Sequence, residues 1–293
     1  MLLHGIILIN LKVSYNIMTT PLHTIYCALV LTLFSCNRNN NKTNNVATQS
    51  LPRDTVATQP KISFNKTDDD LLVSTDLNII SSLNVNQKTE FFENGKQLTK
   101  YITLELIDKA LFDSKKNTSI NFLLADTTAV KKKNGITELK CKNKTVTFID
   151  KPQDNDGMQI FTYVGQMDFI NKYLIAGSYY EGGDYIFVDK TSGDRTNTFI
   201  DYPYISPDKK NIICINSNGY ETTADLELYE ISDNEVNQKM SASFKKWMPL
   251  LENNEMFWNR DGYLYLTVHN VKSFWNEKGL YNNKYQYIRI KIL

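Results

Sequence analysis

The residues best suited to binding a ligand lie together at positions 179–184. Two tyrosines, a glutamate, two glycines and an aspartate form the run Tyr-Tyr-Glu-Gly-Gly-Asp. Aromatic rings stack on sugar rings, and carboxylates accept hydrogen bonds from sugar hydroxyls. The run therefore predicts a glycan-binding loop tip made by Tyr179, Tyr180, Glu181 and Asp184. The same residues also suit an ordinary tight hairpin with solvated carboxylates, and the sequence leaves both alternatives open.

Glycan hydrolysis is the enzymatic alternative, because it requires only two carboxyl groups that face each other across a cleft. The candidate carboxylates are Glu181, Asp184, Asp201 and Asp208. Spacing along the chain does not show whether any two of them converge. Two carboxylates in one cleft would favour a carbohydrate-active enzyme, whereas dispersed carboxylates would favour a binding module.

Other common chemistries lack the residues that they need. His269 is the only histidine after residue 36, which excludes a metal site built on two histidines. No Gly-x-Ser-x-Gly motif accompanies it, and we expect it to be structural. The sequence has neither Gly-x-Gly-x-x-Gly nor Gly-Lys-Ser/Thr, so neither a phosphate-binding loop nor a bound cofactor is predicted.

The charge balance argues against a nucleic-acid partner. The chain has 33 Lys and Arg residues and 32 Asp and Glu residues, and Lys12 is the only one of these before residue 36. The remainder is therefore neutral (33 − 1 = 32 against 32). A nucleic-acid-binding protein usually carries a basic surface, which this balance does not indicate.

A short apolar run at residues 25–34 leads into Ser35 and Cys36, so that the segment ends in Leu33-Phe34-Ser35-Cys36. The run is too short to cross a bilayer but has the length of the apolar part of an export signal. Its end resembles the lipobox of bacterial lipoproteins, with an aliphatic residue three positions before the cysteine and a small residue just before it. The resemblance implies that residues 1–35 are removed and that Cys36 carries a diacylglyceryl group and, usually, an acylated amine. Such chains form a stable membrane anchor.

A polar tether is predicted at residues 36–61. This segment is rich in Asn, Thr and Gln and offers almost nothing to bury, so we expect it to be disordered. No acidic residue closely follows Cys36, whereas surface-exported lipoproteins of some bacteria resemble one another in having acidic residues there. The expected location is the cell envelope, at the outer membrane facing the periplasm, with the cell surface as the alternative. Met18 is an alternative start to Met1.

The remaining residues, 62–293, show the pattern of a mainly β domain. Apolar and polar residues alternate with a period of two at residues 263–268 and 287–292, which is typical of half-buried strands. Asn-Gly, Gly-Gly and Asp-Gly pairs separate such runs and predict tight turns. Residues 103–112 alone show helical spacing. We therefore expect antiparallel meanders with one short helix at 103–112.

A repeat is present in the second half of this domain. Ser206-Pro207-Asp208-Lys209 precedes an apolar run at 211–215, an Asn-Gly loop and a strand pattern at 225–229. Residues 173–189 repeat the strand, glycine loop and second strand. A looser copy runs from 259 to 292. The repeat predicts that the two runs of each unit lie in one antiparallel sheet, with the second run in the next strand or the one after.

The repeat unit resembles a blade of the TolB-type β-propellers, which carry a Ser-Pro-Asp-Gly-Lys turn followed by an apolar strand. Here Lys209 stands in place of the usual glycine. Asp184 and Asp225 are 41 residues apart (225 − 184), close to the roughly 40–45-residue period of a blade. The resemblance covers residues 160–293 and implies a propeller-like fold. A β-sandwich and an irregular antiparallel domain remain as alternatives.

Two cysteines, Cys141 and Cys214, lie in the predicted domain. In an oxidising envelope they are able to form a disulfide, and otherwise they are free thiols that act as small apolar side chains. The sequence leaves both possibilities open. Taken together, the residues favour a non-enzymatic binding or scaffold lipoprotein whose partner is an envelope protein or a glycan. The alternative is a carbohydrate-active enzyme.

Overall fold

The fold is taken from a computed structural model that describes residues 70–250, 256–276, 279, 282 and 284–293. The predicted export signal, Cys36 and tether lie outside these residues. Within the described part of the chain, no helix is both long and apolar enough to cross a membrane.

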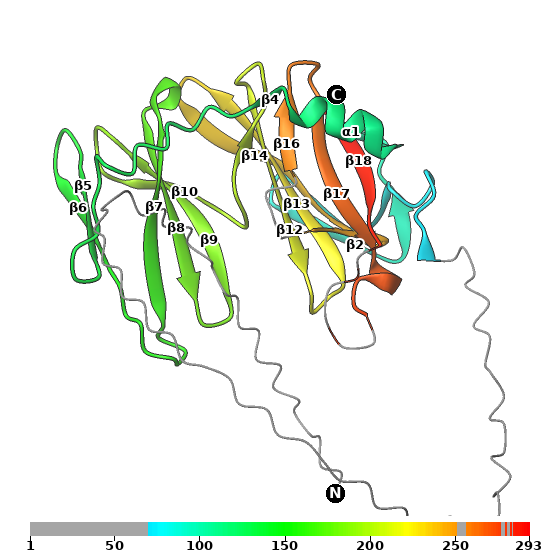
Figure 1. The fold of residues 1–293 in the computed structure, drawn as a ribbon, viewed down its shortest axis with the longest axis horizontal. Coiled ribbons are helices and arrows are strands. Elements are labelled where there is room, and N and C mark those ends of the chain that lie inside the picture. Colours follow the sequence, from blue (N-terminus) through cyan, green and yellow to red (C-terminus); the bar gives the residue numbers. More distant parts are fainter. Residues whose placement is uncertain (1–69, 251–255, 277–278, 280–281, 283) are drawn as a thin grey trace, which may run out of the picture. The chain divides into compact units, whose positions relative to one another are not determined.

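The elements are named in chain order (Figure 1). They are β1 (Ile79–Val85), β2 (Lys88–Gln97), β3 (Ile102–Ile107), α1 (Lys109–Lys116), β4 (Ser119–Ile120), β5 (Ile136–Lys140), β6 (Thr145–Ile149), β7 (Gln159–Met167), η2 (Asp168–Ile170), β8 (Lys172–Tyr179), β9 (Gly182–Asp189), β10 (Arg195–Phe199), β11 (Tyr204–Ile205), β12 (Asn211–Asn218), β13 (Thr223–Ser232), β14 (Glu235–Phe244), β15 (Trp247–Pro249), β16 (Met256–Asn259), β17 (Leu264–Asn270), η3 (Val271–Ser273) and β18 (Gln286–Ile292).

The strands form three larger antiparallel sheets and one hairpin, which confirms the predicted mainly β class. The β7–β10 sheet has the order β10-β9-β8-β7, and the β11–β14 sheet has the order β11-β12-β13-β14-β1-β2. The β16–β18 sheet has the order β3-β18-β17-β16-β4, with β15 also paired to β17, and β5 and β6 form the hairpin. The described sheets match the irregular antiparallel alternative, because β1 to β4 are added to the later meanders and no ring of equal blades results.

For both units, the prediction that the two runs lie in one antiparallel sheet is confirmed. Strand β8 pairs with β9 from Lys172–Asp189 to Tyr179–Gly182, and β12 pairs with β13 from Asn211–Glu230 to Asn218–Thr223. The two pairs occupy the same places in successive four-stranded meanders, β7 to β10 and β11 to β14. The sequence repeat is therefore a repeat of sheet topology.

A similar turn precedes β8 and β12, the second strands of the two meanders, and also β17 in the third sheet. Asn171, Lys209 and Gly262 have positive φ angles of 55°, 60° and 81°. Each donates its backbone N–H to the carbonyl oxygen three residues earlier, over N···O distances of 3.1, 2.9 and 3.1 Å. Glycine adopts positive φ without steric cost, which explains why the similar propeller turns carry glycine where Lys209 stands here.

The one α-helix among the described residues begins later than the sequence predicts. Residues 102–107 form strand β3, and α1 begins after Asp108, whose Oδ1 accepts a hydrogen bond from the Leu111 N–H at 2.7 Å. The prediction of a helix from residue 103 was therefore wrong. Apolar residues at 102, 104 and 106 also fit a period of two, and pairing with β18 along the whole of β3 selects the strand.

Hydrophobic clusters hold these layers together. Strand β12 is buried on both faces, with Ile213 and Ile215 in a cluster shared with the β16–β18 sheet and Ile212 and Cys214 in a cluster shared with the β7–β10 sheet. The other face of the β7–β10 sheet packs on the β5–β6 hairpin. Burial on both sides explains why residues 212–215 form a continuous apolar run.

The two cysteines of the domain are free thiols in this structure. Cys214 is buried between the β7–β10 and β11–β14 sheets. Cys141 is partly buried and packs against the cluster beneath the β5–β6 hairpin. The thiols therefore belong to different layers of the core, and both act as small apolar side chains.

Candidate ligand-binding sites

The predicted loop tip is the turn between β8 and β9. Tyr179 ends β8, and its hydroxyl donates a hydrogen bond to Asp184 Oδ1 at 3.0 Å. Gly177 pairs with Asp184 across the sheet, and a Cβ atom there would overlap both polar groups. Tyr180 and Glu181 form the turn itself and are exposed. The four residues therefore divide into an internally bonded pair and two solvent-facing side chains.

Burial sets the protonation of the internal pair. It raises the pKa of Tyr179 to about 12, and the hydrogen bond to Asp184 adds to this effect. Burial also raises the pKa of Asp184. The Tyr179 hydroxyl thus remains a donor at neutral pH and is already used by Asp184. Tyr180, which is 44% exposed, is the aromatic ring at this turn that is open to a ligand.

The four candidate carboxylates are dispersed over three connections. Glu181 and Asp184 lie at the β8–β9 hairpin, Asp201 lies between β10 and β11, and Asp208 lies between β11 and β12. Asp208 Oδ1 accepts hydrogen bonds from Ser206 Oγ at 2.6 Å and from the Lys210 N–H at 3.1 Å, which closes its turn. Asp184 and Asp208 are thus each hydrogen-bonded within their own turn, which favours the binding alternative over the hydrolase.

Sequence reasoning missed a half-buried carboxylate, Glu227. It lies in the alternating strand β13, where its position predicts exposure to solvent, but the β7–β10 sheet packs over that face. Its Oε2 accepts from the Tyr229 hydroxyl at 2.8 Å, and its Oε1 accepts from Gln238 Nε2 at 3.3 Å. Burial raises the pKa of Glu227. These contacts fix the carboxylate and also position Gln238.

His269 occupies the interior of β17, as expected of a structural residue. Its ring is fully buried, with Nδ1 3.0 Å from the carbonyl oxygen of Lys284 and with Phe274 and Tyr285 at its edges. Nε2 has no hydrogen-bond partner among the described residues. Burial lowers the pKa of His269, so the neutral ring is the form that the site favours.

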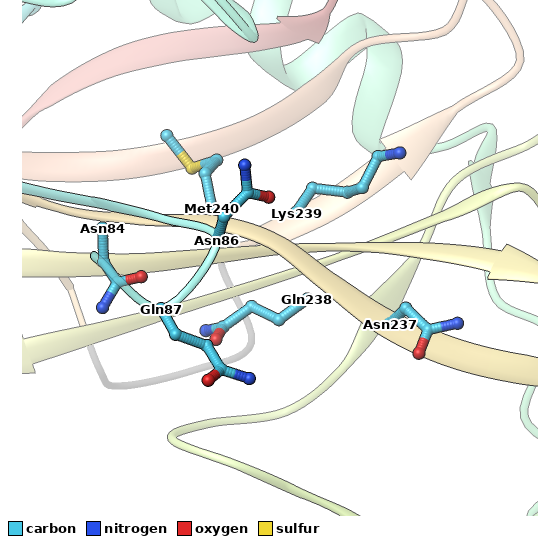
Figure 2. A pocket seen from close by; sticks show the side chains of 7 residues that line it. All are labelled: Asn84, Asn86, Gln87, Asn237, Gln238, Lys239 and Met240. Atoms are coloured by element: carbon cyan, nitrogen blue, oxygen red, sulfur yellow. The ribbon is translucent and has the colours of Figure 1, made fainter. Parts of the chain in front are cut away.

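A cavity of about 410 Å³ lies where the β1–β2 hairpin meets β14 (Figure 2). We call it the carboxamide cavity, because five of its seven lining side chains end in a carboxamide. The lining residues are Asn84, Asn86, Gln87, Asn237, Gln238, Lys239 and Met240. Figure 2 shows Asn84, Gln87 and Gln238 on one side of the β14 ribbon and Lys239 on the other.

The cavity follows from unequal strand lengths. Strand β1 pairs with β14 only as far as Asn84–Ser241, whereas β14 begins at Glu235. The start of β14 therefore runs past the end of β1 and leaves space beside the β1–β2 turn. The register of β14 also shifts near Lys239, and three successive residues, 237–239, are exposed. Such a bulge leaves one residue unpaired and redirects the side chains around it.

An exposed aromatic residue, Phe91, lies on the same face of the sheet as the lining residue Asn84. Asn84 Nδ2 donates to Thr89 Oγ1 at 2.7 Å, so these two side chains share a face of the sheet. Phe91 lies two residues after Thr89 in β2 and therefore projects from the same face. The ring of Phe91 is 81% exposed. The face thus combines an open aromatic ring with a group of carboxamides.

The turn that carries two of the lining residues adopts a costly conformation. Asn86 and Gln87 have φ angles of 52° and 63°. Two successive positive φ angles are typical of a two-residue hairpin turn, in which Asn-Gly is the preferred pair. Gln87 stands where glycine would be more stable, so its side chain is retained at a local energetic cost.

The chain was compared with protein-family models, with curated proteins and with solved structures, and no match was found. Among the described residues, no group of three or more His, Cys, Asp or Glu side chains is arranged to hold a metal ion.

Proposed function

We propose that this chain is a lipid-anchored protein of the cell envelope whose folded domain binds a neutral glycan without transforming it. The carboxamide cavity, with the exposed Phe91 on the same sheet face as Asn84, is the observation that carries the proposal. A carboxamide both donates and accepts hydrogen bonds, as a sugar hydroxyl does, and so matches a neutral polyhydroxylated ligand. An exposed aromatic ring supplies a stacking surface for the apolar face of a sugar.

The charge of the cavity fits the same ligand class. Lys239 is its only charged lining residue, and its Nζ lies 2.8 Å from Glu230 Oε2. Its charge is thereby largely compensated. Met240, the one apolar lining residue, is buried and belongs to the hydrophobic core. A neutral ligand with many hydroxyl groups suits such a lining better than a strongly charged one.

Two further observations support the proposal. Asp184 and Asp208 are held by hydrogen bonds within their own turns, which favours a binding protein over a glycosidase with two facing carboxyl groups. The sequence before the domain predicts a lipid on Cys36 and a polar tether, which would hold the domain within reach of envelope glycans. The expected location is the outer membrane facing the periplasm.

Glycan binding is tested by calorimetric titration of the full chain carrying Cys36→Ala with soluble oligomers of glucose and of N-acetylglucosamine. We expect binding of at least one series, with about a tenfold loss of affinity in Phe91→Ala from the lost stacking. Gln87→Gly should also weaken binding, while relieving its turn. The matched control is Tyr180→Ala, which removes the exposed ring of the β8–β9 turn.

Unchanged affinity in Tyr180→Ala supports the carboxamide cavity. If Tyr180→Ala lost binding and Phe91→Ala retained it, the glycan would instead bind at the loop tip of residues 179–184. Failure of both oligomer series to bind at millimolar concentration would contradict the glycan proposal.

Lipidation is tested by mass spectrometry of the N-terminal peptide from membrane fractions. We expect acylated Cys36, and Cys36→Ala should abolish stable membrane association, because the acyl chains provide the anchor. An abundant cellular form with an intact Met1 or Met18 terminus would contradict the anchor.

A further inference from the structure

A second cavity, of about 620 Å³, lies where the β5–β6 hairpin and the segment before it meet the β7–β10 sheet. We call it the lysine cavity. Lys131 and Lys133 come from the segment before β5, Lys140 ends β5, and Gln166 and Tyr173 come from β7 and β8. Glu138 is its one acidic lining residue. Three ammonium groups against one carboxylate make this lining basic.

Of the residues that the structure describes, several lysines near the cavity form ion pairs with carboxylates, whereas the lysines that line it do not. Four lysines of this region, Lys132, Lys144, Lys172 and Lys190, each have a carboxylate within 2.7–2.8 Å, provided by Asp150, Asp194, Asp189 and Asp168. Within the described part of the chain, Lys131, Lys133 and Lys140 have no such ion pair. Lys142 and Lys151 of the same hairpin also have no such ion pair among the described residues, but the unpaired lysines that share one cavity are Lys131, Lys133 and Lys140.

The run Lys131-Lys132-Lys133 contains both kinds of lysine. Lys132 Nζ binds Asp150 Oδ2 at 2.7 Å and does not line the cavity. Its two neighbours both line it. Three consecutive residues of one type are therefore divided into one ion-paired side chain and two cavity side chains.

We propose that the lysine cavity binds a phosphate-bearing anion. Lysine ammonium groups bind phosphate as point charges, and three of them from two segments surround one space. Backbone hydrogen bonds join the two segments, because Lys133 before β5 and Ile136 at the start of β5 each donate to the other's carbonyl oxygen, over 2.9 and 2.8 Å. The Tyr173 hydroxyl donates to the carbonyl oxygen of Lys140 at 3.0 Å, which fixes the end of β5 to β8.

The size of the cavity indicates more than a single inorganic ion. Gln166 and the ring of Tyr173 provide polar and aromatic contacts for an organic part attached to the phosphate. A soluble phosphate ester and the headgroup of an anionic phospholipid share this chemistry. The inference does not depend on glycan binding, because the two cavities use different residues on different sheets.

The test uses the full chain carrying Cys36→Ala, so that no acyl anchor contributes. Glycerol 3-phosphate is titrated by calorimetry, and vesicles of phosphatidylglycerol are compared with vesicles of phosphatidylcholine in a sedimentation assay. The double variant Lys131→Gln with Lys133→Gln should lose about tenfold or more in affinity. Lys140→Gln should weaken binding in the same direction.

Lys132→Gln is the matched control, because it removes the same charge from the same run but from outside the cavity. Affinity that falls only in the cavity variants supports the site. Binding of glycerol 3-phosphate would identify the ligand as a soluble phosphate ester, whereas binding of phosphatidylglycerol vesicles alone would identify it as a lipid headgroup. Equal loss in Lys132→Gln would show general charge attraction and overturn the proposal. Binding of neither probe would also overturn it.

Discussion

The two meanders β7–β10 and β11–β14 share one plan and differ in what is attached to them. Leu174 and Ile213 are equivalent, since each lies three residues before the partner of the repeated aspartate, Asp184 or Asp225. Leu174 packs between its own sheet and the β11–β14 sheet, and Ile213 packs between its own sheet and the β16–β18 sheet. Each meander therefore directs the same strand position toward the next sheet.

Both cavities lie where a segment outside the repeat meets one of these meanders. The β1–β2 hairpin extends β14 and leaves the carboxamide cavity, whereas the β5–β6 hairpin covers the face of the β7–β10 sheet and borders the lysine cavity. The two hairpins, which lie outside the repeat, therefore build the candidate sites, and they also contribute side chains such as Ile80 and Phe148 to the core.

The largest expected effect tests whether the two meanders are energetically equivalent. Replacing the fully buried Ile213 with Asp would bury an unpaired carboxylate and should lower the free energy of unfolding by several kcal/mol. Leu174→Asp should have a similar cost. Urea unfolding measures both, with Thr198→Asp on the exposed side of β10 as the control. A Leu174→Asp protein as stable as the original would break the equivalence.

An intermediate effect concerns Asp201, in the connection between the two meanders. Burial raises its pKa from 3.8 to about 6, so the folded state binds this proton more tightly than the unfolded state does. The stability that it contributes is therefore present at low pH and is lost as pH rises from about 4 to about 6.

Asp201→Asn should accordingly be more stable than the original chain at pH 7, by an amount on the order of 1 kcal/mol, and should lose this part of the pH dependence. Urea midpoints from pH 4 to pH 8 measure the difference, and Asp156→Asn in an exposed turn controls for the loss of one charge. A difference between the two proteins that does not change with pH would contradict the assignment.

The smallest effect concerns the recurring turn. Glycine at position 209 should gain about 1 kcal/mol from its positive φ, but it loses the contacts of Lys209 Nζ with the rings of Phe122 and Phe169. The Nζ lies 4.8 and 4.9 Å from the two ring centroids. We therefore expect Lys209→Gly to be nearly neutral and Lys209→Ala to be about 1 kcal/mol less stable than Lys209→Gly.

Asn171→Gly sharpens this comparison at the equivalent turn of the first meander. Asparagine tolerates positive φ better than most residues, so the change in thermal midpoint should be small. Equal stability of the glycine and alanine variants at position 209 would show that its φ carries no cost.

The sequence predicted the strands and the repeat because both depend on local periodicity. Alternation at 287–292 and the continuous apolar run at 212–215 specify strands buried on one or both faces. The predicted start of the helix at residue 103 was wrong because Leu104 and Ile107 fit helical spacing but lie in strand β3. Only the pairing of β3 with β18, which is not local, decides between the two.

The candidate sites were less predictable for a related reason. Asn84 and Gln238 line one cavity although they are far apart in the chain, and as single polar residues near turns they show no distinctive pattern. Lys131 and Lys132 are indistinguishable by type, and the ion pair with Asp150 separates their roles. The predicted tip at 179–184 was locally visible, but the hydrogen bond between Tyr179 and Asp184 depends on the absence of a side chain at Gly177.

The pairing of β3 with β18 joins residues that are far apart in the chain, as in the contact of Glu105 with Arg289 over 184 positions. The Leu293 N–H also donates to the carbonyl oxygen of Tyr101 at 2.9 Å. The β16–β18 sheet is therefore completed only after synthesis has reached β18, more than 170 residues after β3. Contacts of such long range also slow folding.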